Sequence, residues 1–354
     1  MDKFQSKLNF QSSINHLILR EVGIIDCFKG KWNALEQCEN EVLVKLKKSA
    51  ATISAGSSTR IEGIKLSDKE IAALLNLKDS SQLTSKDEQE VFGYYEALKV
   101  VLKKKNEIQL SHAYIKDLHQ LLLKYCIEDD DHRGKYKTKP NRAVTTNANG
   151  SLRVIFNTTE PSYVDKEMTE IIDWVNLQFK LKKLHPLLIV GLFVYEFLSI
   201  HPFQDANGPL SRLLTIHLLY NLDYRFIQYT SLEKIIETHQ NEYFKALQEG
   251  QINRYSYEER VDKWILFFVR TLSMLSSELE HKHNTLKSKK SYVNSRQKKI
   301  IAFIKKNQPI KLADLHEAML DISINTLKKD LIYLKSKELI NAKGKNRGAT
   351  YTLV

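Results

Sequence analysis

One short stretch constrains the fold of this chain more than any other. It begins as an apolar run over residues 187–200 and continues as His201-Pro202-Phe203-Gln204-Asp205-Ala206-Asn207-Gly208-Pro209-Leu210-Ser211-Arg212. The run contains Glu196 and is too short to cross a membrane, so it predicts a buried helix. A second helix follows, and we expect its N-cap at Gly208 and its first residue at Pro209. The sequence therefore predicts two buried helices joined by a tight polar turn.

The turn contains the side chains that phosphate chemistry requires. A helix N-terminus offers unpaired N–H groups and a partial positive charge, which favour a phosphate. Asp205 can hold the Mg²⁺ that accompanies polyphosphates, and His201 can act as a general base. Arg212 lies one helical turn after Gly208, and its side chain can reach the same place. The turn predicts a phosphate-binding site.

Charge and cysteine content separate the end of the chain from the rest. Residues 285–354 carry 16 Lys and Arg against 5 Asp and Glu, so most of the net charge of +12 lies there. Cys27, Cys38 and Cys126 are scattered without metal-ligand spacing. This pattern favours a reducing, cytoplasmic location. We expect no membrane partner, and the sequence permits a monomer or a homodimer.

Helical spacing of apolar residues dominates the chain, so we expect a mainly α fold. Three places predict strands: a hairpin over residues 143–157, with its turn at Asn147 to Gly150, and two strands flanking residues 344–348. We expect an N-terminal helical region over residues 1–109, a helical core over 110–283 and a C-terminal domain over 291–354. The polar, lysine-rich residues 281–295 are expected to form a tether.

The C-terminal segment is similar to winged helix-turn-helix domains. Helices are expected over residues 296–305, 312–319 and 324–336, followed by a two-stranded wing. Ser323 is the expected N-cap of a recognition helix. The residues expected to contact DNA are Asn325, Thr326, Lys328, Lys329, Lys345 and Arg347. The alternative is a winged helix that binds protein and keeps a solvated basic face.

The turn resembles the core motif of the Fic family, His-Pro-Phe-x-Asp/Glu-Gly-Asn-Gly-Arg-x-x-Arg. It matches at His201, Pro202, Phe203, Asp205, Asn207, Gly208 and Arg212. It departs at Ala206, which replaces a glycine, and at Pro209, which replaces an arginine. The resemblance implies a Fic-type helical domain with a β-hairpin flap.

The resemblance also implies a reaction: the transfer of AMP from ATP to a Ser, Thr or Tyr hydroxyl of a target protein. His201 would take the hydroxyl proton and Asp205 would hold Mg²⁺. The residues expected to bind ATP or its phosphates are Phe203, Ala206, Asn207, Gly208, Arg212, Tyr243 and Phe244. Phe203 is expected to anchor the turn, and Tyr243 and Phe244 either wall the adenine or belong to the core. The hairpin would dock the target by strand pairing.

The two departures are expected to weaken the reaction. An alanine at a positive φ costs about 1 kcal/mol. A proline removes one N–H and one guanidinium, and removal of such a charge-assisted bond costs about 1.5–3 kcal/mol. Together they predict a rate lower by about two to three powers of ten.

A distant segment resembles the inhibitory motif of the same family, Ser/Thr-x-x-x-Glu-Gly/Asn. It matches at Ser58, Glu62 and Gly63, at the end of a helix expected over residues 41–61. An acid at a helix C-terminus needs a cation. The resemblance implies that this cation is Arg212, the last arginine of the core motif. A Glu62–Arg212 pair would then inhibit the enzyme. The alternative is a solvated glutamate before a glycine cap.

The sequence therefore predicts a protein adenylyltransferase that Glu62 inhibits and that Ala206 and Pro209 weaken. One alternative is a non-catalytic, ATP-sensing regulator that binds DNA. Another is an enzyme that removes AMP from a modified protein.

Overall fold

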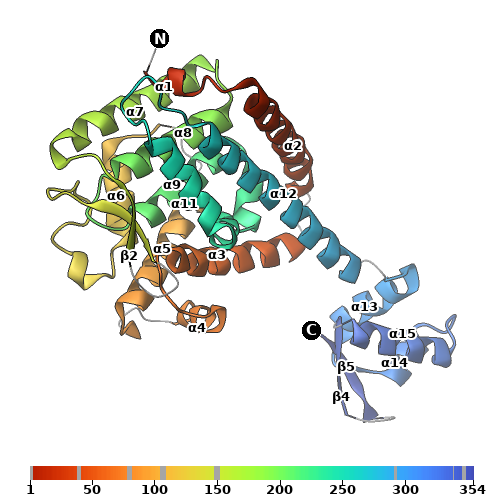
Figure 1. The fold of residues 1–354 in the computed structure, drawn as a ribbon. Helices are drawn as coiled ribbons and strands as arrows, with labels where there is room; N and C mark the ends of the chain where they lie inside the picture. The colour runs from red at the N-terminus through yellow and green to blue at the C-terminus, as the bar shows by residue number, and fades with distance from the viewer. Residues whose placement is uncertain are drawn as a thin grey trace. The chain divides into compact units, whose positions relative to one another are not determined.

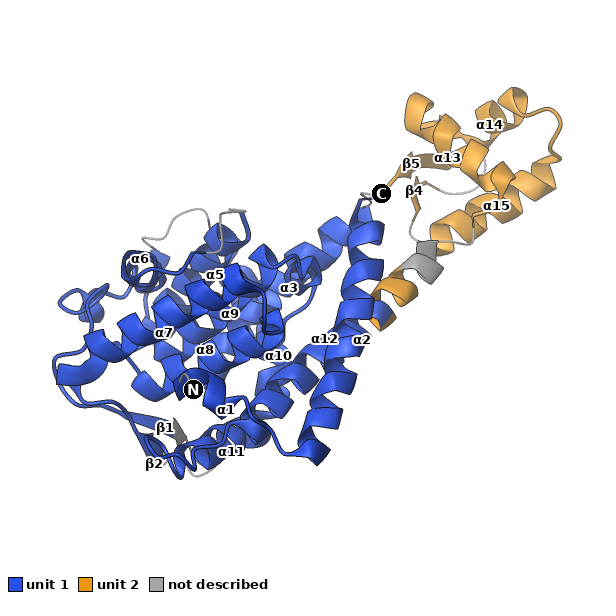
Figure 2. Cartoon of the chain, turned by 90° about the horizontal axis from the view of Figure 1, so that it is seen from above, with its two compact units in different colours: residues 1–280 blue, residues 281–354 orange. Residues whose placement is uncertain are grey.

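The fold is described from a computed structural model that covers residues 3–37, 41–77, 82–103, 109–146, 152–290, 293–337, 339–344 and 348–354. The chain divides into two compact units, residues 1–280 and residues 281–354 (Figure 2). Both are built mainly from helices, as predicted (Figure 1). No helix in the described ranges is long and apolar enough to span a bilayer.

The first unit consists of helices and one hairpin. The helices are α1 (Lys3–Lys7), α2 (Ser12–Glu36), α3 (Glu41–Ile61), α4 (Asp68–Leu74), α5 (Lys86–Lys103), α6 (His112–Leu122), α7 (Pro161–Leu181), α8 (Pro186–Ile200), α9 (Asn207–Asn221), α10 (Leu232–Thr238), α11 (Gln240–Gln251) and α12 (Asp262–Lys290), with 3-10 turns η2 (Ile127–Asp129) and η3 (Arg225–Tyr229). The last ten residues of α12 belong to the second unit. The strands are β1 (Arg142–Thr146) and β2 (Leu152–Asn157).

Helices α8 and α9 form the centre of this unit. Helix α8 is apolar almost all round, so it is buried on every side. Helix α9 packs against α8 and also against α3, α5 and α6 (Figure 1). Helices from before and after residue 109 therefore share one core, and the domain boundary expected there lies inside a single compact unit.

The hairpin pairs β1 with β2 in antiparallel register, from Arg142 opposite Asn157 to Thr146 opposite Leu152. A register shift between Ala143 and Val144 interrupts the pairing. The expected turn at residues 147–150 lies outside the described residues.

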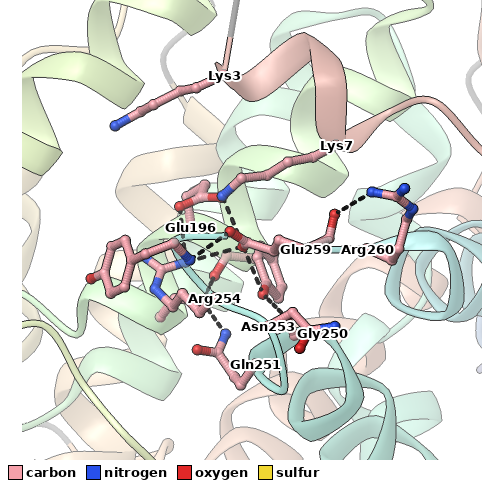
Figure 3. Close-up of polar contacts among 12 residues, drawn as sticks. Lys3, Lys7, Glu196, Gly250, Gln251, Asn253, Arg254, Glu259 and Arg260 are labelled. Atoms are coloured by element: carbon pink, nitrogen blue, oxygen red, sulfur yellow. Dashed lines mark hydrogen bonds and ion pairs between the residues drawn. The ribbon is translucent and has the colours of Figure 1, made fainter. Parts of the chain in front are cut away.

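A buried network of charged side chains connects α8 to neighbouring parts of the first unit (Figure 3). Glu196 of α8 accepts from Lys7 at 2.5 Å and from Arg254 at 3.1 Å. Glu259 also accepts from Lys7, at 2.8 Å. Burial alone would raise the pKa of Glu196, but Arg254 and Lys7 outweigh burial and hold that pKa below its ordinary value. The network connects α1, α8 and the loop after α11.

The second unit contains α13 (Ser295–Asn307), α14 (Leu312–Ala318) and α15 (Ile324–Ser336), with strands β3 (Ile310–Lys311), β4 (Ile340–Lys343) and β5 (Thr350–Leu353). The sheet order is β3-β5-β4, and both pairings are antiparallel. A core of its own fills this unit. The three helices match the predicted ranges to within two residues.

Two expectations for this part of the chain were wrong. The short strand β3 was not predicted, because two residues are too few to show an alternating pattern. The segment expected as a tether is helical as far as Lys290, at the end of α12. Lysine is a good helix former, so a polar segment without Pro or Gly can continue a helix.

We predict that Arg254→Met lowers the free energy of unfolding by about 3 kcal/mol, because it leaves two buried carboxylates with fewer cations. Lys263→Met is the matched control, since Lys263 forms an exposed pair with Glu249, and we expect a change below about 0.5 kcal/mol. Denaturant unfolding measures both values. Equal stability of the two variants would contradict the assigned importance of the network.

Candidate active site

The turn between α8 and α9 begins and ends with residues in the left-handed region. His201 caps α8 with φ 53° and ψ 62°. Ala206 precedes α9 with φ 58° and ψ 17°, so the alanine adopts the backbone conformation for which a glycine was expected. Gly208 was predicted as the N-cap and Pro209 as the first residue, but α9 begins at Asn207. The prediction was wrong because the carbonyl of Ala206 already accepts the first bond of the helix, two residues before the expected cap.

The N-terminus of α9 faces a cavity. The first bond of the helix joins Leu210 N–H to the carbonyl of Ala206. The N–H groups of Asn207 and Gly208 precede that bond and have no acceptor within the helix. Pro209 has no N–H, so it adds nothing to this end. The helix end is therefore an anion seat with two backbone donors.

The cavity has a volume of about 670 Å³ and is lined by the turn, the end of α3, α5, the hairpin and α11. This size falls in the range of small-molecule sites. His201, Asp205, Ala206, Asn207, Gly208 and Arg212 all line it, together with Glu62, Gly63, Tyr243 and Phe244. Residues expected to bind a nucleotide and residues expected to inhibit thus meet at one cavity.

Arg212 is buried and is held by the end of α3. Its Nη2 donates to Glu62 Oε1 at 2.8 Å and to the carbonyl of Ser58 at 2.9 Å. Its Nε donates to Ser58 Oγ at 3.0 Å. Burial acts to lower the pKa of Arg212, but the Glu62 carboxylate reverses the effect and the pKa is raised. The two side chains expected to pair are in contact.

The Glu62 carboxylate also lies against the N-terminus of α9. A Cβ placed on Gly208 would come within 2.3 Å of Glu62 Oε1. Gly208 therefore leaves room for an oxygen close to the helix end. Gly63, next to Glu62, has φ 104°, which suits a glycine after the last turn of α3. A carboxylate of the chain itself therefore lies between Arg212 and this helix end.

His201 presents one ring nitrogen to the cavity. Its Nδ1 lies 3.0 Å from the carbonyl of Leu198, an acceptor that places the ring proton on Nδ1. Nε2 then carries the lone pair that a general base needs. Burial lowers the pKa of His201 to about 4, and the charge of Lys137 acts in the same direction. The imidazole is neutral at physiological pH.

Asp205 is the candidate metal ligand. Its side chain is 56% exposed, and Oδ2 lies 3.9 Å from Lys86 Nζ. Oδ1 accepts from the N–H of Ala206 at 2.7 Å. Within the described ranges no three His, Cys, Asp or Glu residues converge on a metal site. An open carboxylate at a phosphate seat fits Mg²⁺, which binds one or two carboxylates and completes its shell with phosphates and water.

Two of the predicted phosphate-binding side chains shape the turn itself. Phe203 is fully buried and stacks on His119, with ring centroids 3.9 Å apart, so its side chain is an anchor and not a ligand contact. The Asn207 carboxamide accepts from Phe203 N–H at 2.9 Å and donates to the Phe203 carbonyl at 2.8 Å. Its contact with a phosphate stays a prediction.

Tyr243 and Phe244 both line the cavity. They were expected either to wall the adenine or to belong to the core, and Tyr243 fits both interpretations. Its ring packs against Phe244, with centroids 5.2 Å apart, and against Trp264 at 5.7 Å. Only 4% of Tyr243 is exposed, whereas Phe244 is partly exposed. Phe244 is therefore the more accessible surface for a ligand ring.

Sequence reasoning missed several residues that hold the turn. Lys137 and Asn141 bind its carbonyl groups, and His119 Nε2 lies 3.3 Å from the Asp205 carbonyl. Lys86, beside Asp205, was also missed. A histidine on the apolar face of a helix was the one available signal, at His119. His217 is buried, and its Nδ1 lies 2.8 Å from the Tyr114 hydroxyl.

Parts of the chain are similar in sequence to proteins named as adenylyltransferases. A protein adenylyltransferase Fic from Drosophila willistoni is 27% identical over 211 residues, which are 58% of this chain and 39% of that protein. Protein adenylyltransferase fic-1 from Caenorhabditis elegans is 34% identical over 59 residues, or 17% of this chain and 11% of that protein. The chain thus spans less than half the length of these curated relatives.

The fold is similar to that of a crystal structure of a Fic family protein from Desulfovibrio desulfuricans G20. The TM-score is 0.64 at 20% sequence identity, and the similarity covers 96% of each chain. The model of the Fic/DOC family matches residues 109–219, which include α8, the turn and most of α9. Residues 109–219, which contain the turn and the cavity-lining end of α9, therefore match the Fic/DOC family domain.

Proposed function

We propose that the chain is a protein adenylyltransferase that moves AMP from ATP to a Ser, Thr or Tyr hydroxyl, and that Glu62 inhibits it. One observation carries the proposal: a carboxylate already bonds to Arg212 and lies against the N-terminus of α9. A site that accommodates one anion beside a buried guanidinium and a helix end suits the phosphates of a nucleotide. The activity for which the relatives are named supports the same reaction.

The reaction follows from the groups that surround the cavity. Nε2 of His201 takes the proton of the target hydroxyl, and that oxygen forms a bond to the α-phosphorus of ATP. The bond from the α-phosphorus to the β-phosphate oxygen breaks, and pyrophosphate leaves. The N–H groups of Asn207 and Gly208 and the Arg212 guanidinium offset the phosphate charge. Asp205 would hold Mg²⁺, which supplies further charge neutralisation when bound.

Glu62 inhibits by occupying the position of the terminal phosphate. Its carboxylate takes the charge-assisted bond of Arg212 and the space over Gly208. ATP then binds without that contact, and its α-phosphorus is not aligned with the hydroxyl. Displacement of Glu62 restores the contact, since Arg212 is still positioned by Ser58.

Ala206 and Pro209 lower the rate of AMP transfer that is left once Glu62 is displaced. Ala206 has a positive φ, which costs about 1 kcal/mol for a residue with a Cβ. Pro209 is the third residue of α9, and it leaves the anion seat with one N–H fewer. Both residues act on the phosphate seat and leave His201 and Asp205 in place.

We propose the hairpin as the docking edge for the target. It lines the cavity beside His201 with Ala143, Val144, Ile155 and Phe156. Val144 and Val154 are 43% and 44% exposed on it, which gives an extended target segment an apolar surface. Strand pairing there would bring a hydroxyl toward His201.

We predict that Glu62→Gly raises AMP transfer about tenfold or more, because a charge-assisted bond to the terminal phosphate becomes possible. Label from ATP marked at the α-phosphate would appear on protein. His201→Ala in the same background is the control, and we expect it to remove the label while ATP still binds.

Either of two results would contradict this proposal and favour another function. ATP that is bound but intact in Glu62→Gly, and also after Ala206→Gly with Pro209→Arg, would favour a non-catalytic sensor. Release of AMP from a modified protein, without net transfer, would favour the removal reaction.

We predict that His201 stays neutral, with its proton on Nδ1, from pH 8 down to about pH 5. Burial lowers its pKa to about 4, so the base is lost only as the pH falls toward that value. Nitrogen NMR of the histidine rings measures both the tautomer and the midpoint, with His201→Ala for assignment. A midpoint near 6.5 would contradict the buried, neutral base.

We also propose that the second unit is a winged-helix domain that binds DNA. Ser323 caps α15, and its Oγ accepts from the N–H of Thr326. Asn325, Lys328 and Lys329 are exposed on α15, and Thr326 is partly exposed. Lys345 and Arg347 lie outside the described residues. An exposed basic helix face beside a separate core favours contact with phosphate backbones.

We predict that Lys328→Ala with Lys329→Ala weakens binding of the full chain to duplex DNA. The slope of log affinity against log salt should fall by about one unit for each phosphate that the variant no longer binds. Lys305→Ala with Lys306→Ala, at the exposed end of α13, is the matched control. A chain that does not bind DNA even at low salt would assign this unit to protein docking.

A further inference from the structure

One segment before the hairpin binds the carbonyl groups around His201. The backbone N–H of Lys137 donates to the Pro202 carbonyl at 2.8 Å. The Nζ of Lys137 donates to the Ile200 carbonyl at 3.1 Å. Asn141 Nδ2 donates to the Phe203 carbonyl at 2.8 Å. The carbonyls on both sides of His201 are thus held by residues of a single short segment.

The same groups also hold the base of the hairpin. Lys137 Nζ donates to Asn141 Oδ1 at 2.7 Å and to Thr158 Oγ1 at 2.9 Å. The Thr158 hydroxyl lies 2.7 Å from Asn141 Oδ1. Asn141 directly precedes β1 and Thr158 directly follows β2. One ammonium therefore joins both ends of the hairpin to the residue before His201.

Lys137 is an unusual residue for a purely structural contact. Only 4% of it is exposed, and its three acceptors are neutral oxygen atoms. A buried charge without a close counter-ion is costly, and burial lowers the pKa of Lys137 to about 8. A neutral polar side chain could bind a carbonyl at lower cost. The charge of Lys137 is close enough to act on the His201 imidazole.

We propose that Lys137 is a positioning residue for His201. It binds the peptide carbonyls on both sides of the histidine and so holds the His201 backbone in the left-handed conformation. This backbone conformation directs Nε2 to the cavity, and the same ammonium ties it to the hairpin. This role rests on the proposed function, in which His201 is the base and the hairpin docks the target. A target strand paired with the hairpin would thereby restrain the base that acts on its hydroxyl.

Histidine NMR tests the positioning without any turnover. We expect Lys137→Met to shift the His201 ring signals and to populate the tautomer with the proton on Nε2. Lys137→Arg should restore part of the parent pattern, because it returns a buried cation and donors. Lys139→Met is the matched control, since Lys139 is exposed two residues further on, and it should leave the signals unchanged.

Kinetics in the Glu62→Gly background give the second measurement. We expect Lys137→Met to lower kcat about tenfold or more and to change the KM for ATP by less than about threefold, because misplacement of the base affects the chemical step. If Lys137→Met does not fold, Thr158→Val removes one partner of the ammonium, and Thr158→Ser keeps it.

The outcomes separate the two proposals. Parental His201 signals and parental kcat in Lys137→Met, or in Thr158→Val in its place, would overturn the positioning role. Absence of AMP transfer even in Glu62→Gly would count against the proposed function alone, and the NMR comparison would still decide the role of Lys137.

Discussion

A buried guanidinium at the N-terminus of a buried helix needs an anion, and most of this site follows from that need. Arg212 and the free N–H groups of α9 concentrate positive charge at one point of the cavity. A positive charge that is removed from water without a partner is costly. In this state Glu62 supplies the anion from α3. In the proposed function a nucleotide supplies the anion instead, so Glu62 and the terminal phosphate would compete for the Arg212 guanidinium beside the helix end.

The turn that leads to α9 is arranged around the same point. His201 and Ala206 both have positive φ, so the chain reverses sharply between two buried helices. Residues with such strained backbone angles persist only where several surrounding contacts hold the backbone in place. Here Phe203 is stacked beneath the turn, Asn207 bonds across it, and the Lys137 segment binds its carbonyls. Hydrogen bonds therefore connect His201, the N-terminus of α9 and the base of the hairpin, and in the proposed function Glu62 is the group that ATP displaces.

The sequence predicted the helices well where the pattern was strong and local. The apolar run became α8, and the range expected for α3 agrees with the structure. The prediction failed where a single backbone angle, or a contact between residues far apart in the sequence, determines the structure. A positive φ at Ala206 moved the start of α9, and no local pattern shows that Lys137 lies under His201. The contact of Glu62 with Arg212 spans 150 residues and was expected only from the family resemblance.

In the proposed function Glu62 holds the seat of the terminal phosphate. Equilibrium binding of ATP and of ADP to the parent chain and to Glu62→Gly would show this, because ADP lacks that phosphate. We expect the variant to bind ATP about tenfold more tightly or better and its affinity for ADP to change by less than about twofold, as for one charge-assisted bond. Equal gains for both nucleotides, or no gain for ATP, would contradict it.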